Sequence, residues 1–365
     1  MTESKNWPDW LPLREQLRPL TPYGAPQVPA SAQLNTNENP YGPSTGFASA
    51  IAKRIGEVAQ TLNRYPDRDA NTLRTNLANY LESQTGALLF KENIWAANGS
   101  NEILQSIFLA FGSSSALGFV PSYSMHALIG KVANVQWLEG ERNADFTLNV
   151  NSAIDQIANV KPALTFLTTP NNPTGTSVTV ADIEALAFAT SKVNGLLIVD
   201  EAYAEFSSQK SAITLIDKYP NVIVTRTMSK AFAFAGARLG YMAANSKIVD
   251  AIQLVRLPYH LSAITQAAAE VALEFQSELL AEVDKLKSDR ELVASGIRNL
   301  GLKVLPSDAN FLLFTGFKST SAELWQKLLA DGVLIRDVGL AGYLRVTIGN
   351  EAENKKFLTA LKGAL

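Results

Sequence analysis

The chain has 365 residues and a mass of 39.5 kDa, with 32 Lys and Arg against 34 Asp and Glu. A chain of this length buries about three quarters of its unfolded surface and needs no disulfide or metal to fold. The balanced charge argues against a nucleic-acid partner, which requires a basic surplus. The absence of cysteine excludes a disulfide scaffold, a cysteine nucleophile and thiolate metal sites.

No apolar run reaches the 18 or so residues of a membrane helix, and the first ten residues are polar. His126 and His260 are the only histidines, which leaves little for a zinc site, so no metal is expected. We interpret both histidines as structural or solvated. The sequence therefore predicts a cytoplasmic protein without membrane or nucleic-acid partners.

Residues 1–45 carry eight of the sixteen prolines. Proline cannot donate a backbone hydrogen bond, so this segment is predicted to be an extended arm. Leu20, Tyr23 and Leu34 offer apolar anchors, which favours an ordered arm over a floppy tail.

From residue 46 to about 265, helical and strand patterns alternate. Short apolar runs without polar alternation lie at 116–120, 163–167, 196–199, 222–224 and 239–243. Helical spacing follows residue 100 and recurs over 180–192. Such strands are covered on both faces, so the pattern predicts a large α/β domain with a mainly parallel sheet.

The C-terminal part, residues 266–365, has a different pattern. Residues 262–300 are predicted to form two helices that connect the domains. Strands are expected at 303–305, 311–314, 333–336 and 344–348, with a last helix from about residue 351. This pattern predicts a smaller α+β domain.

Ligands of open α/β sheets bind beyond the carboxyl ends of the strands. The residues that follow the predicted strands are Asn172, Asp200, Tyr203, Ser229 and Lys230, with Arg238 eight residues after Lys230. Each alone has an ordinary explanation, such as a helix cap, a turn or a solvated lysine. Together they match the needs of pyridoxal phosphate (PLP): a lysine for the aldehyde, a carboxylate for the ring nitrogen, donors for the 3-oxygen and cations for the phosphate. The helix entrance at Gly99, Ser100 and Asn101 adds an anion site, although these residues would also suit a plain N-cap.

Several sequence blocks resemble the fold-type-I aminotransferases, and more narrowly the histidinol-phosphate aminotransferase family. They are TTPNNPTG at 168–175, VDEAYAEF at 199–206, TMSKAF at 227–232, GARLG at 236–240, LNTNENPYGPS at 34–44, RYPD at 64–67, ANGSNE at 97–102, PSYSM at 121–125 and LRVTIG at 344–349. The resemblance covers the chain from about residue 17 to the end. Ala233 and Phe234 depart from the smaller or aliphatic residues common in the family, away from the chemistry.

The resemblance implies a role for each matched residue. Lys230 would form the Schiff base with PLP and then act as general base, and Asp200 would pair with the ring nitrogen. The other implied cofactor contacts are Asn172 and Tyr203 at the 3-oxygen, Tyr123 on the ring face, and Gly99, Ser100, Asn101, Ser229 and Arg238 at the phosphate. Tyr65 would reach the phosphate of the neighbouring subunit, which implies a homodimer.

The resemblance also implies the substrates. Arg345 would bind the carboxylate of glutamate or 2-oxoglutarate, while Arg336 and Tyr23 would approach the substrate phosphate. Asn35, Asn37 and Glu38 would shape the mouth of the site. An alternative for Arg336 is a surface ion pair with Asp337.

The activity implied is that of a PLP-dependent histidinol-phosphate transaminase of L-histidine biosynthesis. It would interconvert L-histidinol phosphate and 2-oxoglutarate with imidazole acetol phosphate and L-glutamate. An aromatic amino acid aminotransferase and a threonine-phosphate decarboxylase on the same scaffold stay open as alternatives. A non-catalytic, aminotransferase-like ligand sensor is disfavoured by the short arm and the net charge of −2. A nucleotide-binding Rossmann protein is disfavoured because no Gly-x-Gly-x-x-Gly follows a strand.

Overall fold

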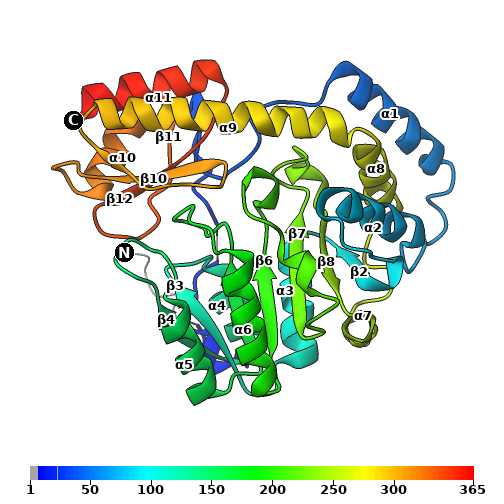
Figure 1. The fold of residues 1–365 in the computed structure, drawn as a ribbon. Coiled ribbons are helices and arrows are strands. Elements are labelled where there is room, and N and C mark those ends of the chain that lie inside the picture. Colours follow the sequence, from blue (N-terminus) through cyan, green and yellow to red (C-terminus); the bar gives the residue numbers. More distant parts are fainter. Residues whose placement is uncertain (1–6, 23) are drawn as a thin grey trace.

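The computed structural model describes residues 7–22 and 24–365 (Figure 1). Its large sheet has seven strands in the order β2-β8-β7-β6-β5-β3-β4. Their bounds are β2 Ile94–Ala97, β3 Ser115–Val120, β4 Gln136–Glu141, β5 Leu164–Thr168, β6 Leu196–Asp200, β7 Val222–Thr227 and β8 Gly240–Ala244. Only β8 runs antiparallel to its neighbours, which confirms the predicted mainly parallel α/β sheet.

The prediction missed the two edge strands, β2 and β4. β4 has one buried residue in six, because an edge strand is covered less than a central one. β2 is a fully buried apolar run of four residues, which the prediction overlooked. Only β4 lacked the apolar run that identified the other five strands.

Helices cover both faces of the large sheet. One face packs against α3 (Ser100–Phe111), α4 (Met125–Val132) and α7 (Ser246–Ile252). The other is covered by α2 (Asn71–Thr85), α5 (Val150–Val160), α6 (Val180–Lys192) and α8 (Ala263–Glu274), while α1 (Thr45–Ala59) packs on α8. Within β6, Ile198 joins the first core while Leu197 and Val199 join the second. This division explains the unbroken apolar runs, since each side chain is buried on one face or the other.

The C-terminal part contains a three-stranded antiparallel sheet in the order β12-β10-β9. Its elements are β9 Lys303–Val304, β10 Phe311–Thr315, α10 Ser321–Ala330, β12 Tyr343–Thr347 and α11 Glu351–Ala364. The two helices predicted over 262–300 are confirmed as α8 and α9 (Gln276–Asn299). In Figure 1, α9 runs along the top of the molecule from α8 to the C-terminal elements. The predicted domain boundary near residue 265 stays a prediction.

The N-terminal arm is tied to both parts of the chain. Strand β1 (Ala32–Gln33) pairs in parallel with β11 (Val333–Leu334), so residues 333–334 join the arm and not the three-stranded sheet. The side chain of Arg14 donates at 2.6 Å to the carbonyl of Val132, the last residue of α4. Leu34 is buried and Leu20 half-buried, whereas the third predicted anchor, Tyr23, lies outside the described residues.

Five short 3₁₀ helices complete the described chain. They are η1 Glu15–Leu17, η2 Lys91–Asn93, η3 Ala204–Phe206, η4 Ala212–Leu215 and η5 Ala235–Ala237. Across residues 7–22 and 24–365, no helix has the length and apolar character that crossing a membrane requires.

Candidate active site

A cavity of about 530 Å³ lies at the carboxyl edge of the large sheet, under the arm and the C-terminal sheet. Most of the residues predicted for the site line it: Asn35, Asn37, Glu38, Gly99, Ser100, Asn101, Tyr123, Asn172, Asp200, Tyr203, Ser229, Lys230, Arg238, Arg336 and Arg345. The fold thus gathers residues from across the chain into one cavity. Tyr65 lies elsewhere, and Tyr23 is outside the described residues.

Lys230 lies in the turn after β7, with its amine at the centre of the cavity. Its Nζ donates to the carbonyl of Thr36 at 3.0 Å. Burial, with a further contribution from Arg345, lowers the pKa of Lys230 to about 8, against a smaller opposing effect of Glu38. Roughly a tenth of this amine is therefore neutral at pH 7, and the neutral amine is the form that acts as nucleophile and base.

Asp200 ends β6 and is 2% exposed. Its Oδ2 lies 3.0 Å from Nε2 of His126, and the backbone N–H of Ala202 donates to its Oδ1. His126, on α4, is 1% exposed, so the prediction of a structural or solvated histidine missed its contact with the site. A signal was present, because His126 follows the predicted ring-stacking residue Tyr123 by three positions, about one helical turn.

His260, the second histidine, is half-buried and lies away from the cavity. Its ring stacks on Trp95 with the ring centroids 5.0 Å apart. Its Nε2 lies 2.9 Å from the carbonyl oxygen of Ala96. This residue is structural, as one of the two interpretations had it.

Arg345, on β12, reaches from the C-terminal sheet into the cavity. Its Nη1 donates to Oδ1 of Asn172 at 2.6 Å, and its Nη2 donates to the carbonyl of Asn35 at 2.8 Å. The guanidinium lies over the ring of Phe311, 5.1 Å from its centroid. These contacts fix the plane of the guanidinium between the large sheet and the arm.

Asn37, on the arm, connects three parts of the site. Its Nδ2 donates to the hydroxyl of Tyr203 at 2.9 Å, and its Oδ1 accepts from Oγ1 of Thr347 at 3.0 Å. The side chain of Asn310 donates to the carbonyl of Asn37 at 3.1 Å. Sequence reasoning missed Thr347 and Asn310, and nothing in their local sequence signals this role.

The N-terminus of α3 faces Arg238 across a close backbone approach. A Cβ on Gly99, whose φ is +85°, would lie 2.9 Å from Nη2 of Arg238. A Cβ on Gly240 would lie 2.1 Å from the backbone nitrogen of Ser100. Only glycine fits at either position. The first turn of α3 and the Arg238 guanidinium therefore border the same end of the cavity, where N–H groups of a helix N-terminus can bind an anion.

Arg336 and Tyr65 complete the predicted set. Arg336 pairs through its backbone with Arg345 and lines the cavity, as Asp337 does. In the part of the chain that the structure describes, Arg336 forms no salt bridge, so the alternative ion pair with Asp337 is absent. Tyr65 is 79% exposed and stacks on Tyr259, with 4.3 Å between the ring centroids.

The donors and acceptors of the cavity fit PLP. The end of the cavity bordered by Gly99 and Arg238 suits its phosphate, the buried Asp200 suits a protonated ring nitrogen, and Lys230 presents an amine in the same cavity. In the described residues, no group of three or more His, Asp or Glu is placed to hold a metal ion.

The fold and the site together define a PLP-dependent aminotransferase. The model of the family "Aminotransferase class I and II" matches residues 31–361. The chain is 53% identical over 353 residues to the histidinol-phosphate aminotransferase of Mycobacterium sp. (strain KMS), covering 96% of this chain and 93% of that protein. It is 54% identical to the corresponding protein of Nocardia farcinica, covering 96% and 91%.

A solved structure agrees with these relatives. The histidinol-phosphate aminotransferase of Sinorhizobium meliloti in complex with pyridoxal-5'-phosphate superposes with a TM-score of 0.86 at 25% identity, covering 97% of each chain. The chain therefore belongs to the class I and II aminotransferases and, within them, to the histidinol-phosphate aminotransferases. The predicted resemblance, fold class and cofactor are confirmed.

Proposed function

We propose that this chain transfers an amino group between L-histidinol phosphate and 2-oxoglutarate, giving imidazole acetol phosphate and L-glutamate, in L-histidine biosynthesis. One observation carries the proposal: a single cavity combines a lysine whose pKa is lowered to about 8 with a buried carboxylate and two cationic ends. PLP, when bound, supplies the ring that accepts electrons from the substrate's α-carbon. The chain supplies the proton transfers and the orientation.

Lys230 is the proton carrier of this mechanism. Its neutral amine takes the proton from the α-carbon of the bound amino donor. In the second half of the reaction it returns a proton to the corresponding carbon of the bound acceptor. The backbone carbonyl of Thr36 orients the amine by accepting its hydrogen bond. The bond from Lys230 to a backbone carbonyl leaves the lone pair of the amine free to face the cavity.

Asp200 holds a proton on the ring nitrogen of the cofactor. His126 supports this role, because an Nε2–H group donating to Asp200 fixes the carboxylate and stabilises its charge. Asn172 and Tyr203 hold the 3-oxygen, and each is itself fixed, by Arg345 and by Asn37 respectively. Tyr123 covers the ring.

Cationic residues at the two ends of the cavity bind different anions, the cofactor phosphate at one end and the anionic groups of the substrates at the other. Ser100, Asn101, Ser229 and Arg238 bind the cofactor phosphate at the N-terminus of α3. At the opposite end, Arg345 binds the carboxylate of glutamate and Arg336 approaches the phosphate of histidinol phosphate. Asn37 and Glu38 border the mouth.

A homodimer completes the site. Tyr65 is exposed, and Leu62, Leu254 and Leu257, which are near Tyr65 or its stacking partner Tyr259 in the sequence, are 52%, 85% and 74% exposed. The stacking of Tyr65 on Tyr259 holds the two segments together. Large exposed apolar side chains of this kind are typical of an interface. We place Tyr65 at the cofactor phosphate of the second subunit.

Subunit complementation tests the shared site. Tyr65→Ala and Lys230→Ala homodimers are each expected to be nearly inactive. Mixed and re-equilibrated, they form heterodimers with one site that has both residues, so activity is expected to return to about a quarter of the wild-type value per subunit. Mixed variants that form heterodimers and stay inactive would place Tyr65 outside the partner's site.

The activity itself is tested by substrate choice. The PLP-loaded protein receives L-histidinol phosphate, L-phenylalanine or L-threonine phosphate, each with 2-oxoglutarate, and glutamate is measured. We expect kcat/KM to be highest for histidinol phosphate. A higher value for phenylalanine would assign the protein to the aromatic aminotransferases, and carbon dioxide release from threonine phosphate would assign it to the decarboxylases. The cytoplasmic location stays a prediction.

A further inference from the structure

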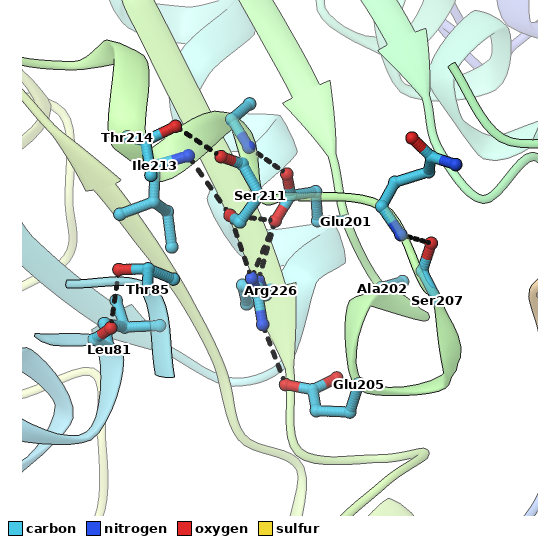
Figure 2. Close-up of polar contacts among 12 residues, drawn as sticks. Leu81, Thr85, Glu201, Ala202, Glu205, Ser207, Ser211, Ile213, Thr214 and Arg226 are labelled. Atoms are coloured by element: carbon cyan, nitrogen blue, oxygen red, sulfur yellow. Dashed lines mark hydrogen bonds and ion pairs between the residues drawn. The ribbon is translucent and has the colours of Figure 1, made fainter. Parts of the chain in front are cut away.

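Arg226 is a buried arginine that the mechanism above does not use. It lies on β7, four residues before Lys230, and is 4% exposed. Figure 2 shows its guanidinium between two carboxylates. Its Nε and Nη2 contact Oε2 of Glu201 at 3.0 and 2.8 Å, and its Nη1 contacts Oε1 of Glu205 at 2.9 Å.

Further hydrogen bonds fix both carboxylates. The hydroxyl of Ser211 donates to Oε2 of Glu201 at 2.7 Å and accepts from Nη2 of Arg226 at 3.0 Å. The backbone N–H of Ala212 donates to the other oxygen of Glu201, and the hydroxyl of Tyr80 donates to Glu205 at 3.3 Å. We call Arg226, Glu201 and Glu205 the carboxylate clamp.

The carboxylate clamp holds the segment that carries two predicted cofactor contacts. Glu201 directly follows Asp200, and Glu205 lies two residues after Tyr203. Neighbouring residues at a strand end point to opposite faces, so Asp200 faces His126 while Glu201 faces Arg226 on the other side of the sheet. The carboxylate clamp therefore contacts the end of β6 on the face of the sheet opposite His126.

The energetics favour a geometric role over a stabilising one. Burying one cation and two carboxylates carries a desolvation cost that the ion pairs offset only with good geometry, so such a cluster is weak evidence for stability. The planar guanidinium does provide fixed directions: it bonds Glu201 and Glu205 with different edges at once. A lysine could not hold both carboxylates in these positions.

We propose that the carboxylate clamp is a positioning device for the cofactor contacts, which rests on the proposed use of PLP. Arg226 anchors residues 201–205 to β7, the strand that leads into Ser229 and Lys230. It thereby fixes Asp200 and Tyr203, on one strand end, relative to the lysine on the next. Arg226, Glu201 and Glu205 touch neither the cavity nor the substrate.

The test compares Arg226→Lys with Arg74→Lys. Arg74 is 6% exposed and bonds the backbone carbonyls of Lys91 and Ile94, far from the cavity lining, so it is a matched buried arginine. Glu205→Gln is a milder second variant, because its amide oxygen still accepts from Tyr80 and Arg226. Folding is checked by circular dichroism and thermal unfolding before any other measurement.

The readouts are the Kd of the apoprotein for PLP and the pH midpoint of the bound cofactor's absorbance change. Asp200 and Tyr203 contact the cofactor ring in the proposal, so both readouts report their placement. We expect Arg226→Lys to raise the Kd about tenfold and shift the midpoint by at least about 0.5 pH unit, with smaller shifts in the same direction for Glu205→Gln. Arg74→Lys is expected to lower the unfolding temperature and leave both readouts unchanged.

Two results would overturn the positioning role. One is a folded Arg226→Lys protein with wild-type Kd and midpoint, and the other is an equal change in Arg74→Lys. The wild type serves as the reference for the proposed function, because a wild-type protein that fails to bind PLP would overturn that function first. A wild type that binds PLP, with variants that bind it equally well, would overturn only the role of the clamp.

Discussion

Two cations lie four residues apart, Arg226 buried on β7 and Lys230 half-buried in the turn that follows, and their surroundings give them opposite roles. Lys230 lies among Arg345 and Arg238, and burial together with these charges lowers its pKa to about 8. Arg226 lies between Glu201 and Glu205; burial alone would lower its pKa, but the two carboxylates outweigh burial and raise it. The lysine is therefore able to exchange a proton near neutral pH, while the arginine stays charged.

The difference shows that burial alone does not decide what a cationic side chain does. Desolvation penalises the charged form of both residues, and the sign of the neighbouring charges decides the outcome. Desolvation, with neighbours of like charge adding to it, makes Lys230 reactive. Neighbours of opposite charge make Arg226 a fixed structural anchor.

Removing the reactive cation should have the largest effect on activity. Lys230→Ala is expected to lower kcat by at least about 10³-fold, because the amine that transfers the proton is lost. Turnover and the absorbance of bound PLP are the measurements. Lys218→Ala is the matched control, since Lys218 is exposed and pairs with Glu184 away from the cavity. Turnover retained in Lys230→Ala would remove this residue from the mechanism.

Removing the anchoring cation should have the largest effect on stability. Arg226→Met leaves two buried carboxylates without their cation, and we expect the free energy of unfolding to fall by about 3–5 kcal/mol. Urea unfolding of the apoprotein measures this loss. Arg54→Met, at a half-exposed ion pair with Glu270, is expected to cost less than about 1 kcal/mol. Equal losses of unfolding free energy in Arg226→Met and Arg54→Met would contradict the expectation that the buried ion pair is the more costly one to break.

The lowered pKa of Lys230 should be visible in its reactivity. In the apoprotein, the rate at which an amine-specific reagent modifies Lys230 is expected to rise with pH through a midpoint of about 8, as the neutral form accumulates. Arg345→Met removes a neighbouring cation, so the midpoint should move upward by about 0.5–1 unit, an effect of roughly 1 kcal/mol. Peptide mapping by mass spectrometry follows the labelling. A midpoint near 10.5 in the wild type would show that the surroundings do not lower this pKa.

The smallest expected effect is on stability, from removing the hydroxyl of Ser211, which bonds the carboxylate clamp. Ser211→Ala removes one hydrogen bond to Glu201 and one from Arg226, and should lower the free energy of unfolding by about 1–2 kcal/mol. The labelling midpoint of Lys230 should stay at its wild-type value, because Ser211 does not line the cavity. A shifted midpoint would mean that Ser211, although outside the cavity lining, affects the charge environment of Lys230.

The amino-acid sequence by itself determined the mainly parallel sheet, its five central strands and the residues at their carboxyl ends, whereas the order of the strands in the sheet came from the structure. Asp200, Asn172 and Lys230 could be found this way because each lies within six residues after a buried apolar run. A local pattern contains all the information needed for such a residue: the run predicts the strand, and the strand end predicts the site. The helices over 180–192 and after residue 351 followed from periodicity in the same manner.

Only the tertiary structure decided which side chains meet. His126 and Asp200 are 74 residues apart, Asn37 and Tyr203 are 166 apart, and Arg345 and Asn172 are 173 apart. The physical reason is that each of these hydrogen bonds needs angles and distances set by the packing of separate elements, to which no local pattern corresponds. The opposite states of Lys230 and Arg226 follow from the same packing, because the charges that set them come from distant strands and from the arm.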